Sequence, residues 1–217
     1  MVSYGVLFFD LDGTLTDSKE GITKSVQYAL SKFAIKEDNL HNLEKFIGPP
    51  LDESFSKFYS LNEDEVVNAV KYYREYYAVK GIYENSLYPG IPELLEKFQE
   101  LGKDMYIVTT KPTIFAEEVL KYFNIDDYFS QIVGSFLDGR RTSKAELIGY
   151  VLSCIPDVSK NKVVMIGDRK HDILGAKQTG IDSIAVSYGY GTLKELTKVE
   201  PTYIAGSIEE LYGLIAK

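Results

Sequence analysis

Two aspartates stand one residue apart at the end of the first apolar run of the sequence. The stretch is YGVLFFDLDGTL, residues 4–15, in which Asp10 and Asp12 are followed by Gly13. Burying a carboxylate costs free energy unless the group is paired or binds a metal. In an extended segment, side chains two positions apart point to the same side. We therefore interpret the two carboxylates as partners in one reaction.

Other groups that are able to do chemistry come after two later apolar runs or precede a helix. They are Thr109, Thr110 and Lys111 after MYIV, Gly167, Asp168, Arg169 and Asp172 after KVVMI, and Lys144 before a helical pattern. Any one of them alone is ordinary as a helix cap or turn residue. Ligands of open α/β sheets bind beyond the carboxyl ends of the strands. Their joint position therefore predicts one site.

The residue types indicate phosphate chemistry with a metal. Converging carboxylates repel one another, and a hard divalent cation relieves the repulsion. Oxygen ligands without thiols or histidines favour Mg²⁺, which commonly shares a phosphate with the protein. The Thr109 hydroxyl, the Lys144 ammonium and the amides of the Asp12–Gly13 turn would hold that phosphate. We expect Asp10 to attack phosphorus and Asp12 to move protons.

The elements that position these groups alternate between strands and helices from residue 90 onward. Short apolar runs indicate buried parallel strands at 4–9, 105–110, 162–167 and 183–187, and weaker candidates lie at 131–135 and 202–205. Helical patterns lie at 92–102, 113–125, 143–155 and 172–180. The alternation predicts an α/β fold with a Rossmann-like parallel sheet core.

A helical segment interrupts this alternation after the first strand. Residues 16–83 contain helical patterns and no convincing strand. We predict a core domain formed by 1–15 and 84–217 and an inserted α-helical cap domain at 16–83. The segments 14–18 and 83–90 are the natural hinges.

Composition and charge exclude several classes of partner. The net charge of -8 and a pI near 4.9 argue against a nucleic acid polymer or an anionic membrane surface. No apolar segment reaches transmembrane length and no signal pattern is present, so we expect a cytoplasmic protein. Cys154, the single cysteine, excludes an internal disulfide and is expected to be buried. A monomer and a homodimer both remain open.

Four motifs in order carry a family resemblance. DLDGTLTDS, VTTK, Lys144 and GDRKHD resemble the motifs of the haloacid dehalogenase (HAD) superfamily of phosphotransferases, and the helical insert resembles its C1 cap. DSKEGITKS and FIGPPLDESF are similar to the phosphoglycolate phosphatase-like subgroup. The resemblance implies a Mg²⁺-dependent phosphatase that acts on a small phosphorylated metabolite, such as phosphoglycolate or a 5′-nucleotide.

The resemblance also implies roles for individual residues. Asp10 would be the nucleophile and Asp12 the general acid and base. The substrate would be bound by Thr109, Thr110, Lys144 and Gly13. The metal would be bound by Asp10, the Asp12 carbonyl, Asp168 and Asp172, with Asp168 the favoured direct ligand. Thr110 stands where many relatives have asparagine. From its position next to Thr110, and not from the resemblance, we expect Lys111 to cap or flank the site, with a phosphate contact as the alternative.

Two other functions remain as alternatives. A sugar phosphomutase of the β-phosphoglucomutase type would need cap groups that favour a sugar hydroxyl over water, and residues 18–33 contain no histidine to suggest this. A non-catalytic phosphate-binding module would keep the site without turnover. The intact set of acids, Thr109 and Lys144 argues against that module.

Overall fold

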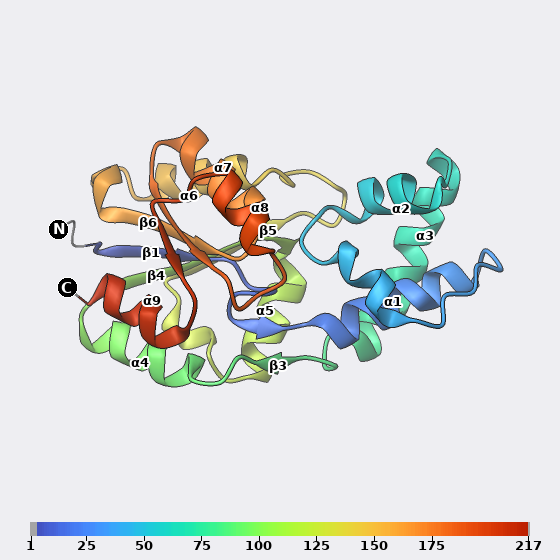
Figure 1. Ribbon diagram of the computed structural model, residues 1–217, viewed down its shortest axis with the longest axis horizontal. Coiled ribbons are helices and arrows are strands. Elements are labelled where there is room, and N and C mark those ends of the chain that lie inside the picture. Colours follow the sequence, from blue (N-terminus) through green and yellow to red (C-terminus); the bar gives the residue numbers. More distant parts are fainter. Residues whose placement is uncertain (1–3, 217) are drawn as a thin grey trace. The chain divides into compact units, whose positions relative to one another are not determined.

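A six-stranded sheet lies at the centre of the larger of two compact units (Figure 1). The computed structural model describes residues 4–216. The strand order is β5-β4-β1-β6-β7-β8, and neighbouring strands are parallel. The strands are β1 (Val6–Phe9), β4 (Asp104–Pro112), β5 (Gln131–Ser135), β6 (Val163–Gly167), β7 (Asp182–Val186) and β8 (Tyr203–Ala205). The predicted Rossmann-like α/β fold is confirmed.

Helices cover both faces of this sheet. They are α4 (Ile91–Glu100), α5 (Thr113–Tyr122), α6 (Lys144–Cys154), α7 (Lys170–Thr179), α8 (Leu193–Lys198) and α9 (Ile208–Ile215), with short 3₁₀ turns η3 (Asp126–Tyr128) and η4 (Lys160–Lys162). Figure 1 shows α6 and α7 on one side of the sheet and α4 and α9 on the other. Every residue of β1 is buried, as expected for a central parallel strand.

Aromatic side chains fill the core on the two faces of β1. Phe8 packs edge to face on Tyr106, with 5.5 Å between ring centroids. Phe9 points to the opposite face, where it lies 6.2 Å from the Phe129 ring and 6.4 Å from the Phe98 ring of α4. The alternation of side chains along β1 thus divides one apolar run between two layers of helices.

Several local features differ from the sequence-based expectations. Helices α8 and α9 were not predicted, although each begins with a capping pattern: Thr192 and Ser207 accept hydrogen bonds from the amides three residues later. Both helices are too short for a clear hydrophobic period. The expected burial of Cys154 is wrong, because its thiol is exposed at the end of α6.

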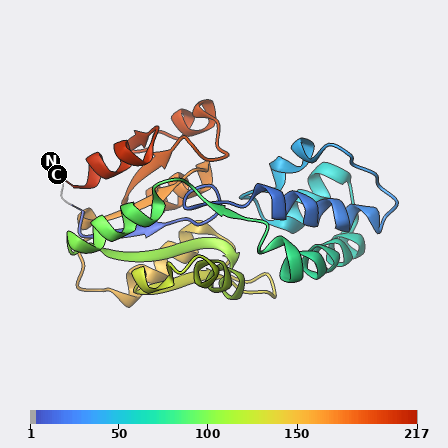
Figure 2. The same cartoon turned by 90° about the horizontal axis from the view of Figure 1, so that it is seen from below.

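The second unit comprises Asp17–Ser86. It contains α1 (Lys19–Ser31), the 3₁₀ helix η1 (Leu40–Phe46), α2 (Leu51–Tyr59), α3 (Glu63–Tyr76) and the π-helix η2 (Tyr77–Gly81). Helices α1 and α3 lie side by side (Figure 2). The chain passes between the units at the short strands β2 (Thr16–Asp17) and β3 (Ser86–Leu87). None of the helices in residues 4–216 has the length and apolarity that a membrane crossing needs.

Two glycines allow a matched test of how tightly β4 and β5 approach. A Cβ at Gly134 in β5 would lie 2.2 Å from the Lys111 carbonyl oxygen, whereas a Cβ at Gly149 in α6 would meet nothing within 4 Å. We expect Gly134→Ala to lower the melting temperature by several degrees, because backbone must move. Gly149→Ala is expected to be neutral or stabilising by up to about 1 kcal/mol. Thermal unfolding of both variants checks this, and an unaltered Gly134→Ala protein would contradict it.

Candidate active site

The register of two central strands brings Asp10 and Asp168 to one edge of the sheet. Phe9 of β1 pairs with Ile166 of β6, and the Asp10 amide donates to the Ile166 carbonyl oxygen at 2.9 Å. Asp168 directly follows the last residue of β6. Because the strands are parallel, their carboxyl ends share the edge where ligands of α/β sheets bind.

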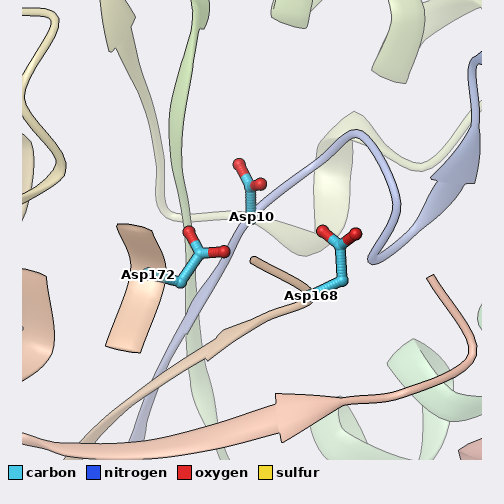
Figure 3. Close-up of side chains that lie close together, drawn as sticks. All are labelled: Asp10, Asp168 and Asp172. Atoms are coloured by element: carbon cyan, nitrogen blue, oxygen red, sulfur yellow. The ribbon is translucent and has the colours of Figure 1, made fainter. Parts of the chain in front are cut away.

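The first turn of α7 adds a third carboxylate to this edge. Asp172 accepts a hydrogen bond from the Arg169 amide at 3.0 Å through its Oδ2 atom, which fixes the start of the helix. Asp10, Asp168 and Asp172 each offer one carboxylate oxygen, and these three oxygens lie within 4.8 Å of one another (Figure 3). The three residues are 6%, 0% and 1% exposed, so water screens their charges poorly.

The glycine after Asp12 makes room for one of these acids. Gly13 has a φ of 86°, which favours glycine. A Cβ at this position would lie 2.3 Å from Oδ2 of Asp168, so the Asp168 carboxylate rests directly on the Gly13 backbone. Gly13 is thereby placed beside a metal-ligand candidate.

Lys144, the first residue of α6, is the cation that faces this cluster. Its Nζ lies 2.9 Å from Oδ1 of Asp10 and 2.7 Å from Oδ1 of Asp172, and it donates to the Val108 carbonyl oxygen at 2.9 Å. Burial lowers the pKa of Lys144, but the two carboxylates outweigh burial and raise it. The side chain therefore carries a positive charge at neutral pH.

One ammonium does not compensate the buried acids. Burial raises the pKa of Asp10 to about 6; Lys144 opposes this rise, and the Asp172 and Asp12 carboxylates add to it. Burial, followed by the charges of Asp172 and Asp10, raises the pKa of Asp168 well above its usual value. These raised pKa values mean that Lys144 offsets only part of the cost of ionising Asp10 and Asp168 side by side.

This donor set fits a hard divalent cation. The oxygens come from carboxylates alone, they are nearly out of solvent, and their charge is only partly balanced. Mg²⁺ prefers such ligands. Asp172 contacts the Lys144 ammonium and accepts the Arg169 amide at the start of α7. In Asp168, Oδ2 accepts the Tyr190 amide at 2.7 Å, and Oδ1 lies 3.5 Å from the Thr14 hydroxyl.

The threonines predicted to bind substrate lie near the end of β4, the strand beside β1. Thr109 is 1% exposed, and its Oγ1 accepts the Lys111 amide at 3.2 Å. Thr110 is partly exposed, and its carbonyl oxygen accepts a hydrogen bond from the Ser135 hydroxyl at 2.8 Å. Both residues therefore reach the same sheet edge as Asp10, by way of the neighbouring strand.

Asp12 is paired with a lysine from β4. The Lys111 Nζ donates to both carboxylate oxygens of Asp12, at 2.7 and 2.8 Å. The two acids of the first motif are thus held by different cations, Asp10 by Lys144 and Asp12 by Lys111. Sequence reasoning placed Lys111 beside the site but did not foresee this pair.

Sequence reasoning also missed the loop after β7. The Tyr190 amide donates to Asp168, and the Tyr188 hydroxyl donates to the Thr14 carbonyl oxygen at 3.0 Å. The loop begins at the carboxyl end of β7. The rule that located the other groups, namely that ligand-binding residues stand just beyond the carboxyl ends of parallel strands, would have found it.

Comparison with known proteins shows the family of this chain. The family model described as "Haloacid dehalogenase-like hydrolase" matches residues 7–186. A 5′-nucleotidase of Pseudomonas aeruginosa is 46% identical over 96% of this chain and 94% of its own length. A phosphoglycolate phosphatase of Vibrio parahaemolyticus is 28% identical over 97% of this chain and 96% of its own length.

Two further similarities concern a solved structure and a relative that is named as a kinase. A crystal structure described as a predicted phosphatase from Clostridium acetobutylicum superposes with a TM-score of 0.95 at 42% identity, over 99% of both chains. Tyrosine-protein kinase PtkA of Mycobacterium bovis is 34% identical over 95% of this chain and 70% of its own length. From the matched segment and these identities, the chain belongs to the haloacid dehalogenase-like hydrolase family.

Proposed function

We propose that the protein is a Mg²⁺-dependent phosphomonoester hydrolase that works through an aspartyl-phosphate on Asp10. One observation carries the proposal: Asp10, Asp168 and Asp172 form a buried carboxylate cluster with Lys144 against it. A hydrolase of this family needs a nucleophile and a way to neutralise a phosphoryl group, and the cluster offers both.

In the first half of the reaction, Asp10 is the nucleophile. A carboxylate oxygen of Asp10 forms a bond to phosphorus while the bond from phosphorus to the leaving oxygen breaks. Asp12 gives its proton to that leaving oxygen, so the product departs as an alcohol. Lys144 and Thr109 hold the phosphoryl oxygens in position.

In the second half, water releases the phosphate. Asp12, now ionised, takes a proton from the water molecule as its oxygen attacks phosphorus. The bond between phosphorus and Asp10 breaks, and inorganic phosphate leaves with Asp10 restored. A Mg²⁺ ion bound by Asp10, Asp168, Asp172 and the Asp12 carbonyl would supply charge neutralisation for the phosphoryl oxygens.

The substrate class is a small phosphorylated metabolite. The relatives named 5′-nucleotidase and phosphoglycolate phosphatase support 5′-nucleotides and phosphoglycolate as the first compounds to test. Because PtkA is named as a kinase, a panel of phosphorylated metabolites should include ATP as a possible donor.

Replacing the nucleophile should separate activity from folding. We expect Asp10→Asn to lower phosphate release by about 10⁴-fold or more, since the amide does not form an acyl phosphate. Phosphate release with Mg²⁺ present is the measurement, and circular dichroism reports the fold. Asp127→Asn, which changes an exposed acid, serves as the matched control and should keep wild-type turnover. Turnover by Asp10→Asn would refute the nucleophile assignment.

The raised pKa of Asp10 predicts how stability of the metal-free protein varies with pH. Because the folded pKa of about 6 exceeds that of an unfolded aspartate, the folded state holds the proton more tightly. This contribution is complete below the unfolded pKa and is lost as the pH rises through about 6. Ionised Asp10 then costs the folded state on the order of 3 kcal/mol.

Melting temperatures in a chelator between about pH 4 and about pH 7 test this expectation. The advantage of Asp10→Asn over wild type should grow across that interval. Mg²⁺ at neutral pH should raise the melting temperature of wild type more than that of Asp10→Asn, because the ion offsets the charge. A difference between the two proteins that does not vary with pH would contradict the assignment.

A further inference from the structure

A second buried lysine lies at the site and has no part in the reaction above. Among the described residues, Lys111 and Lys144 are buried, at 8% and 5% exposed. Lysine is seldom buried unless it is paired. Lys144 is explained by the carboxylate cluster, whereas the partner of Lys111 is the acid that moves protons.

The contact between Lys111 and Asp12 is close and well shielded. The Lys111 Nζ atom lies 2.7 and 2.8 Å from the two carboxylate oxygens of Asp12 and donates a hydrogen bond to each. The side chains are 5% and 13% exposed. A charged pair in this setting restricts the side chain of Asp12 far more than a surface ion pair would.

The backbone that carries Lys111 is itself fixed on several sides. Its amide donates to Oγ1 of Thr109, and its carbonyl oxygen lies where a Cβ of Gly134 would intrude. The pairing of β4 with β5 is irregular between Val108 and Pro112, where a strand commonly re-aims a side chain. The backbone at Lys111 is therefore held by its neighbours where the side chain reaches Asp12.

We propose that Lys111 is a positioning residue that fixes the Asp12 carboxylate where it gives a proton to the leaving oxygen and takes one from water. The inference rests on the proposed function and deepens it. Proton transfer requires the acid to be within hydrogen-bond reach of the reacting oxygen, so a mobile Asp12 transfers protons slowly even when the nucleophile is intact.

Two esters with different leaving groups separate positioning from a general loss of structure. The nitrophenolate of p-nitrophenyl phosphate leaves without protonation, so formation of the aspartyl-phosphate does not need Asp12. Hydrolysis of the aspartyl-phosphate does need Asp12, which takes a proton from the attacking water. An alkyl phosphate needs Asp12 in both steps. We expect Lys111→Met to keep a stoichiometric burst of nitrophenolate, followed by turnover lowered about 100-fold, and to show no burst with the alkyl ester.

A double-mutant cycle then ties the effect to Asp12. Asp12→Asn should give the same burst and slow turnover, and adding Lys111→Met to it should cause almost no further loss, because both changes disable one function. Lys111→Arg keeps the charge and should recover part of kcat. If circular dichroism shows that Lys111→Met folds poorly, the kinetics of Lys111→Arg provide the test instead. Lys121→Met, an exposed change of the same kind on α5, should leave the kinetics unaltered.

The outcomes are distinguishable. A raised KM with unchanged kcat in Lys111→Met would make Lys111 a phosphate ligand and overturn the inference. The inference would also be overturned if the losses of turnover caused by Lys111→Met and Asp12→Asn multiplied in the double variant. A wild-type protein that hydrolyses neither ester and forms no burst would instead overturn the proposed function, and the inference with it.

Discussion

Repulsion between buried carboxylates is the constraint on which this site depends. Asp10, Asp168 and Asp172 are brought within 4.8 Å of one another by parallel strands and one helix start, in a region that water scarcely reaches. Such an arrangement is costly by itself. The packing of α6, which delivers Lys144, offsets only part of the cost. The fold therefore holds carboxylates together at a cost in free energy, and a cation bound among them would lower that cost.

The two acids of the first motif differ because their cations come from different elements. Lys144 reaches Asp10 from the first turn of α6, and Lys111 reaches Asp12 from the end of β4. Asp10 is the more deeply buried and has its pKa raised to about 6. Residues that are almost adjacent in the chain thus experience separate surroundings, which is a physical basis for giving them separate tasks.

The sheet and the position of the site were predictable because they depend on pattern. Apolar runs and the rule about strand ends located β1, β4 and β6 and the functional groups just beyond them. The pair between Lys111 and Asp12 was not predictable, because it depends on where two side chains from separate strand ends meet, which no periodicity encodes. The strand-end rule could have pointed to the loop after β7, but not to the amide of Tyr190 in particular, because a backbone donor carries no residue signature. Cys154 was misjudged because its apolar neighbours say nothing about which side of a helix end it occupies.

The second unit enters the chain as a single continuous stretch, Asp17–Ser86, between β1 and α4. All six strands of the sheet, and the acids and lysines at its edge, lie outside that stretch. A change of length or sequence within that stretch therefore leaves the order and pairing of the strands that carry these acids and lysines unaltered.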